Sequence, residues 1–170
     1  ERMLRDEIEK LPDGDYHADG WLDDDGKNRD QPLKVNVTVR VKGSDITIDL
    51  TGSAPEVETG FNVPYEGSLI VACNYIVRTL LLDEAVLEEF IPQNEGIFRP
   101  VKVVAPKGTI FNPNFPRACF SRFAQIQRVI DCTIQALAPV IPERVTGGNS
   151  ASLYFISYSG FVPEKQQYWM

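Results

Sequence analysis

The sequence predicts an α+β fold in which an antiparallel β-sheet packs against two main helices. Apolar and polar residues alternate over 34–51, as is typical of a half-buried β-hairpin. Apolar residues also recur at helical spacing in two longer stretches, about 68–82 and 118–138. The chain of 170 residues has the length of one ordinary domain, and we expect a single domain or a fragment of a longer chain.

Ahead of the hairpin, we expect a short amphipathic helix over 1–11 and a strand over 15–22. The acidic run 23–25 that follows is either a calcium-binding loop or a solvent-exposed turn. A calcium loop of the EF-hand type needs spaced acidic ligands and a glutamate at its twelfth position. Here the acids are contiguous, and the twelfth residue counted from Asp23 is Lys34. The pattern therefore favours the exposed turn.

The two strands of the hairpin are separated by a short turn that contains Gly43. Ser68 is the expected N-cap of the first long helix, whose apolar face is wide enough to be buried against the sheet. A short strand is expected over 101–104, and prolines end the second long helix after 138. We expect a last strand over 153–158, and both ends of the sequence resemble those of an excised fragment.

Polar side chains stand in three loops at the ends of these elements, and they are the candidate substrate-binding residues. They are Asp49, Thr51, Ser53, Asn62, Asn94 and Arg99. Arginine can hold a carboxylate or a phosphate through two parallel hydrogen bonds, and asparagine can bond an amide or an oxyanion. The alternative for each is a structural role in a turn or a cap. Convergence on one cleft would favour an active site, whereas scatter would favour a scaffold.

Composition argues against several classes of function. The net charge of −7 argues against nucleic-acid binding, and no stretch approaches the roughly 18 apolar residues that cross a membrane. His17 is the one histidine, so a zinc site of several histidines cannot form. It lies between Tyr16 and Ala18 in an expected strand, which is an unsuitable place for the base of a Ser-His-Asp triad. The sequence also lacks a P-loop and a GxGxxG motif, so we expect this chain to bind no metal and no nucleotide cofactor.

Three cysteines, Cys73, Cys119 and Cys132, are widely spaced and form no CxxC motif. The spacing supports neither a zinc ribbon nor a redox motif. We expect reduced thiols, at least two of them buried, in a cytoplasmic protein.

Four stretches resemble the hydantoinase B/oxoprolinase family, and together they cover most of the chain in the family's order. The first is DLTGSAPEVETGFNVP at 49–64, and the second is NEGIFRPVKV at 94–103. The third is GTIFNPNFP at 108–116. The fourth is the second long helix and the residues after it, with Arg122, Arg128, Asp131, Ala136, Leu137 and Pro142.

The resemblance implies that this chain is an internal part of the B-type subunit of an ATP-dependent hydantoinase or 5-oxoprolinase. In that family, an A-type partner subunit uses ATP to phosphorylate an amide or enolate oxygen. The B-type subunit then handles the activated intermediate, by hydrolysis of a small cyclic amide or, in ketone carboxylases, by carboxylation. Some members also carry a divalent metal, which we expect outside this chain because it has no histidine cluster.

Two alternatives to the cyclic-amide hydrolase stay open. One is a component of an ATP-dependent ketone carboxylase, and the other is a non-catalytic scaffold or interaction domain. The chain by itself is expected to be inactive under either enzyme hypothesis. Pairing of exposed edge strands into a homo-oligomer is a further expectation.

Overall fold

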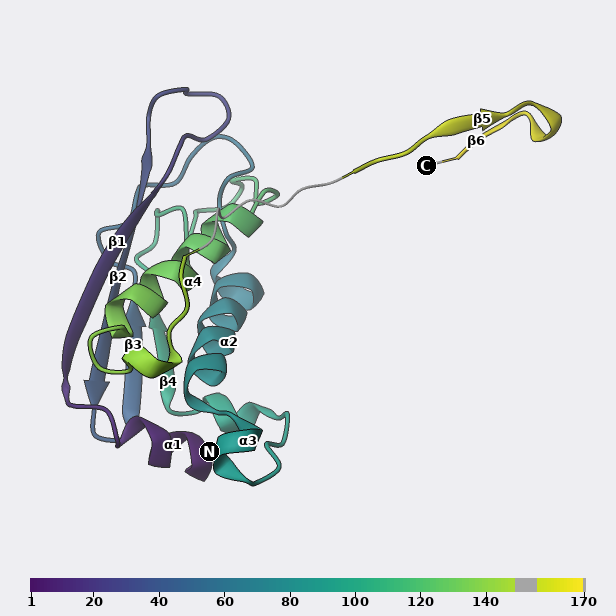
Figure 1. The fold of residues 1–170 in the computed structure, drawn as a ribbon. Helices are drawn as coiled ribbons and strands as arrows, with labels where there is room; N and C mark the ends of the chain where they lie inside the picture. Colours follow the sequence, from purple (N-terminus) through teal and green to yellow (C-terminus); the bar gives the residue numbers. More distant parts are fainter. Residues whose placement is uncertain (149–155, 170) are drawn as a thin grey trace.

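The computed structural model describes residues 1–148 and 156–169, which form a four-stranded sheet with helices on one face and a separate small hairpin (Figure 1). The helices are α1 (Arg2–Ile8), α2 (Ile70–Leu81), α3 (Glu84–Leu87) and α4 (Phe123–Leu137). The strands are β1 (Gly14–Leu22), β2 (Leu33–Lys42), β3 (Asp45–Asp49), β4 (Val101–Val104), β5 (Gly160–Val162) and β6 (Gln167–Trp169). Short helical turns lie at Tyr65–Leu69, Glu95–Phe98, Pro142–Arg144 and Pro163–Lys165.

The strand order in the main sheet is β1-β2-β3-β4. The first three strands are antiparallel, with Ala18 opposite Val37 and Val39 opposite Ile48. β4 instead runs parallel to β3, with Val103 opposite Ile48. The connection from β3 to β4 passes through α2, and such a crossover returns the chain in the same direction. The predicted α+β fold and hairpin are therefore confirmed, and the sheet is mixed rather than wholly antiparallel.

The alternating valines of β2 set the position of the core. Val35, Val37, Val39 and Val41 are at most 3% exposed and point to the face that α4 and α2 cover. α4 crosses β1 and β2, while α2 lies beside α4 (Figure 1). The opposite face carries the polar members of the alternation, as expected for a strand with one buried side.

Both long helices begin later than the sequence predicts. α2 starts at Ile70, after a distorted turn in which Gly67 has a φ of 86°. The helix has no side-chain N-cap, so the prediction for Ser68 is wrong. α4 starts at Phe123 rather than at 118, because Phe120 N and Ser121 N both donate to Gly60 O at 2.8 Å and hold that segment outside the helix.

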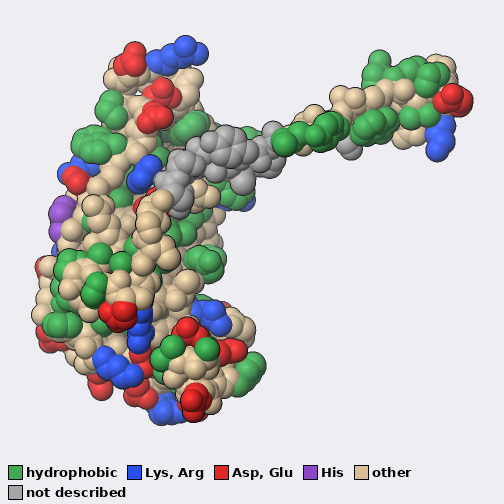
Figure 2. Space-filling model, in the orientation of Figure 1, with side chains coloured by type: hydrophobic (Ala, Val, Ile, Leu, Met, Phe, Trp, Pro, Cys, Tyr) green, Lys and Arg blue, Asp and Glu red, His purple; other side chains and the backbone are tan. Residues whose placement is uncertain are grey.

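The end of the chain also differs from expectation. Residues 153–155 of the expected last strand lie outside the described residues, and 156–158 form no strand. A short hairpin of β5 and β6 follows instead, and it lies apart from the main sheet (Figure 1). Figure 2 shows hydrophobic side chains along this hairpin, where Tyr168 and Trp169 are more than half exposed, as is Tyr158 just before it.

A buried ion pair joins the elements at the lower end of Figure 1. Glu7 of α1 is 3% exposed, and both Arg144 and Lys10 bond its carboxylate. Arg144 Nη1 also donates to Leu81 O at 3.2 Å, where the last carbonyls of α2 lack helical partners. Arg144 therefore joins α1 to the end of α2. Among the described residues, no helix has the length and apolar character needed to cross a membrane.

Candidate functional site

The family-like segments 49–64 and 108–116 lie together beyond the C-terminal ends of β3 and β4. Ile110 N donates to Ala54 O at 3.0 Å, and Val63 N donates to Ile110 O at 2.7 Å. The acidic turn packs beside them, since Lys27 forms an ion pair with Glu58 at 2.8 Å. Loops 23–32, 50–64 and 105–121 therefore form one packed end of the domain (Figure 1).

The acidic turn is more than a solvent-exposed turn, because Asp25 is only 3% exposed. Its carboxylate accepts from the backbone N–H of Lys27 at 3.0 Å and of Asn28 at 2.6 Å, and from the Asn28 side chain at 2.8 Å. These hydrogen bonds, above all the one from Asn28 N, hold the pKa of Asp25 below its usual range. The expectation of a fully solvated turn is thus wrong for Asp25.

Asn62 is completely buried within the packed loops. Its Oδ1 accepts from Val57 N at 2.9 Å. Its Nδ2 lies within 2.9–3.1 Å of the carbonyl oxygens of Val57, Thr59 and Ala118. One side chain thus closes its own turn and joins it to the segment before α4, which favours the structural alternative for Asn62.

Asp49, Thr51 and Ser53 lie together at the end of β3, beside β2. Arg40 Nη1 donates to Asp49 Oδ2 at 2.6 Å, and Thr51 N donates to Asp49 Oδ1 at 2.8 Å. Ser53 Oγ accepts from Asn36 N at 3.0 Å, and Thr51 O accepts from Asn36 Nδ2 at 2.7 Å. These contacts fix the exit of β3 against β2.

The pKa of Asp49 reflects opposing causes. Burial of the carboxylate raises the pKa, but hydrogen bonds from Thr51 and from the Arg40 guanidinium outweigh burial and leave the pKa below its ordinary value. The charged form of Asp49 is therefore the one that the folded state stabilises.

Asn94 and Arg99 lie at the other end of the sheet. Asn94 Oδ1 accepts from Gly96 N at 3.1 Å, as a cap of the turn Glu95–Phe98. The Arg99 side chain is 72% exposed and pairs with Glu1 at 3.1 Å. Arg99 precedes β4, whereas Asp49 ends the parallel strand β3, so roughly 13 Å of strand separates them. The candidate residues do not converge on one cleft, and by that criterion they favour a scaffold role.

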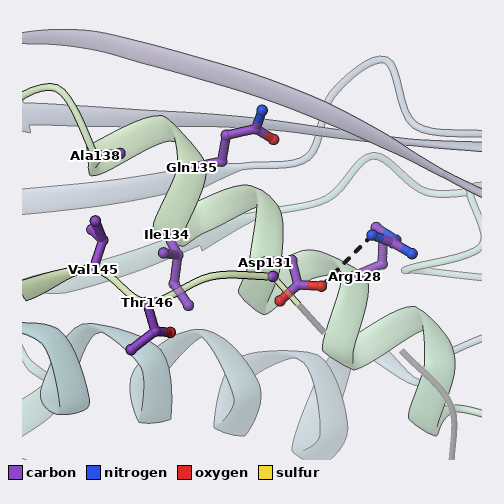
Figure 3. Close-up of a pocket in the computed structure, with 8 residues that line it drawn as sticks. Arg128, Asp131, Ile134, Gln135, Ala138, Val145 and Thr146 are labelled. Carbon is purple, nitrogen blue, oxygen red and sulfur yellow. Dashed lines mark ion pairs between the residues drawn. The ribbon is translucent and has the colours of Figure 1, made fainter. Parts of the chain in front are cut away.

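A pocket of about 390 Å³ lies between α4 and the segment 145–148. Figure 3 shows Arg128 and Asp131 near one another on α4, with Ile134, Val145 and Thr146 farther along. Gln135 and Ala138 complete the wall from the same helix. The pocket thus combines a pair of opposite charges with an apolar stretch, which is the usual character of a small-molecule site.

Arg128 and Asp131 are one helical turn apart, with Nη1 and Oδ2 separated by 3.6 Å. Their side chains are 28% and 11% exposed. The Arg128 side chain lies against Gly20 of β1, where an added Cβ would come within 2.7 Å of Arg128 Cδ. Gly20 therefore leaves the space in which this arginine lies.

Sequence reasoning places Arg128 and Asp131 on the second long helix but not among the site candidates. The one available signal is an arginine and an aspartate at i and i+3 on a predicted helix. Their packing against Gly20, on a strand far away in the sequence, has no local signature.

A second pocket, of about 380 Å³, lies beside loop 105–121. Its cations Arg117 and Lys107 are already engaged: Arg117 pairs with Glu56 at 3.1 Å, and Lys107 Nζ donates to Pro113 O at 2.9 Å. These cations therefore help to hold the loop itself.

The family resemblance implies a metal for some members. Within 1–148 and 156–169, no group of three or more His, Cys, Asp or Glu side chains could hold a metal ion. The described residues therefore do not fit such a group, and no step of the proposed reaction uses one on this chain.

We predict that Asn62→Ala lowers the free energy of unfolding by about 3 kcal/mol, because several buried backbone groups lose their partner. The matched variant Asn94→Ala, at an exposed cap, should cost about 1 kcal/mol. Urea unfolding of both variants measures the difference. Equal costs would show that the Asn62 side chain does not hold the two loops together.

A second prediction concerns Asp49→Asn. Because the folded-state pKa is lowered, the charged carboxylate stabilises the protein above its unfolded-state pKa of about 3.9, and this contribution is lost as the pH falls through the folded-state value. The loss of stability on substitution should therefore be constant from about pH 7 to 5 and shrink below about pH 4.

The control is Asp15→Asn, which removes an exposed partner of the same Arg40. Urea midpoints at several pH values measure both variants, and the control should change little. A loss of stability for Asp49→Asn that is equal at pH 7 and pH 3 would contradict this account.

Comparison with known proteins agrees with the motif resemblance. A family model for hydantoinase B/oxoprolinase matches residues 1–170, the whole chain. The chain is 44% identical over 176 residues to a protein of Pseudomonas sp. (strain NS671) named as a candidate B-type component of a D-/L-hydantoinase. That match covers 100% of this chain and 29% of the Pseudomonas protein.

Two solved structures share the fold. ATP-dependent caprolactamase from Pseudomonas jessenii aligns with a TM-score of 0.69 at 24% identity, covering 84% of this chain and 24% of the other. Nucleotide-free acetone carboxylase aligns with a TM-score of 0.72 at 19% identity, covering 88% of this chain and 21% of the other. The chain thus spans less than a third of each of these three proteins. From the match over its whole length, the chain belongs to the hydantoinase B/oxoprolinase family.

Proposed function

We propose that this chain is part of the B-type subunit of an ATP-dependent enzyme that hydrolyses a small cyclic amide, of the hydantoinase or 5-oxoprolinase type. The observation that carries the proposal is the 44% identity, along the entire chain, to the Pseudomonas protein named as a candidate hydantoinase component. The shared fold with an ATP-dependent caprolactamase is consistent with it. The chain by itself would be inactive and would supply one domain of a longer polypeptide.

The ATP-binding site is proposed to lie on an A-type partner subunit. In the proposed reaction, the γ-phosphoryl group of ATP moves to the amide oxygen and ADP leaves. Water then adds to the activated carbon, and the ring C–N bond breaks to leave an acyl phosphate and a free nitrogen group. A second water hydrolyses the acyl phosphate and releases phosphate. The products are a carboxylate and an amine or urea nitrogen.

A cytoplasmic location is proposed from the cysteines. Cys73, Cys119 and Cys132 are all free, and Cys73 and Cys132 are buried. Burial raises the pKa of the Cys73 thiol to about 12 and that of Cys132 to about 11. Such thiols are structural rather than reactive, as in proteins of reducing compartments.

A homo-oligomer is proposed from the sheet. β1 and β4 are its outer strands, and edge strands are templates for pairing with another chain.

The test is phosphate release by the full-length B-type chain together with its A-type partner. Hydantoin, 5-oxoproline and simple lactams are supplied in turn, and ketones with bicarbonate are supplied separately. We expect release that depends on a cyclic amide and yields the ring-opened product, with none from the A-type partner alone. Release that depends on a ketone and bicarbonate would instead assign the protein to the carboxylases.

A further inference from the structure

The pocket on α4 offers a hydrogen-bond donor and an acceptor side by side. Arg128 Nε and Asp131 Oδ2 have almost no accessible surface. A ligand would therefore bond the other N–H groups of the guanidinium and the other carboxylate oxygen, beside the contacts that these side chains already make. Their 3.6 Å separation keeps the two charged groups on one stretch of the pocket wall (Figure 3). A ligand that matches them must carry an acceptor and a donor next to one another.

The amide of a small ring has that arrangement. Ring closure forces the amide to be cis, so its C=O and N–H lie on the same edge. An open-chain secondary amide is almost always trans, because the cis form costs about 2.5–4 kcal/mol, and its C=O and N–H then point in opposite directions. A neighbouring arginine and aspartate can therefore bond both groups of a ring amide at once, but only one of an open-chain amide.

The rest of the pocket fits the rest of such a ring. Ile134 and Val145 provide apolar surface beyond the charged pair, where ring carbons would lie (Figure 3). The volume of about 390 Å³ is within the range of roughly 300–1,000 Å³ that is usual for small-molecule sites. Partial burial of Arg128 and Asp131 also strengthens hydrogen bonds to a neutral ligand, because water competes less.

We propose that the α4 pocket binds the cyclic amide before its activation, with Arg128 donating to the ring carbonyl oxygen and Asp131 accepting from the ring N–H. Gly20 acts as a positioning residue, because its missing side chain leaves room for the Arg128 stem. This inference rests on the proposed function and adds to it the site and the basis of selection for a ring.

The experiment measures binding by the full-length B-type chain, without ATP and without the A-type partner. Calorimetry or ligand-observed NMR follows hydantoin and 2-piperidone, which are cyclic, and N-methylacetamide, which is a trans amide. We expect the cyclic amides to bind measurably more tightly than N-methylacetamide. Equal binding of the cyclic and trans amides, or no binding of either cyclic amide, would overturn the proposal.

Substitutions on α4 test whether hydantoin binds in this pocket. Arg128→Ala and Asp131→Asn should each weaken hydantoin binding at least about tenfold, because the first removes a charged donor and the second replaces a carboxylate acceptor by a weaker, neutral amide oxygen. Arg128→Lys keeps the charge without the planar fork and should give a smaller loss, so it serves if Arg128→Ala does not fold. Arg122→Ala is the control on the same segment, since Arg122 lies over the Phe123 ring outside the pocket, and it should bind as the unaltered protein does.

Hydantoin binding that is unchanged in Arg128→Ala and Asp131→Asn would overturn the site, whatever the enzyme's turnover. Conversely, the absence of phosphate release from any cyclic amide would remove the proposed function, while binding that depends on Arg128 and selects rings would still support the pocket. The two failures can thus be told apart.

Discussion

The amide side chain of Asn62 is the constraint on which the upper end of the structure depends. It is fully buried and bonds its own turn and the carbonyl of Ala118. Burying an amide is favourable only when its hydrogen bonds are made, so this residue fixes the relative position of two loops that are distant in the sequence. Backbone hydrogen bonds of Ile110 with Ala54 and Val63 join the family-like segments at 49–64 and 108–116. The Asn62 contact adds the residues just before α4 to the same packed end.

The same loops determine where α4 begins and in which direction it runs. Gly60 O accepts from Phe120 N and Ser121 N, and Gln125 Nε2 in the first turn of α4 donates to Phe61 O at 2.7 Å. α4 then crosses β1 and β2, which brings Arg128 against Gly20. The loops of the packed end thus help to place this helix, and the pocket lies between it and the segment 145–148.

The main elements could be predicted from the sequence, because their signals are local. The valines of β2 alternate regardless of their partners, and the apolar faces of α2 and α4 repeat at helical spacing. The starting residues of α2 and α4 could not be predicted in this way, because the segments before the helices determine them. A distorted turn at Gly67 precedes α2, and hydrogen bonds to Gly60 O hold the residues before α4 outside that helix. The parallel pairing of β4 was missed for a similar reason, since nothing in four residues of strand indicates the direction of its neighbour.

The candidate site was predicted less well than the fold. Asp49, Ser53 and Asn62 stand out in the sequence as polar residues at the ends of apolar elements, and the structure places them in hydrogen bonds that shape the loops. A buried structural asparagine and a substrate-binding one look alike in a sequence. Arg128 and Asp131 were visible on a helix, but their pairing beside a glycine of β1 appears only once the chain is folded.

The motif loops position α4, and the pocket on α4 is the surface proposed to contact a cyclic amide. Hydrogen exchange of the full-length chain, with and without saturating hydantoin, distinguishes this pocket from the polar loops as the binding surface. We expect slower amide exchange within 128–146 and no change around 94–99. Protection at 94–99 and 49–53, with none in 128–146, would contradict it and return the site to the polar loops.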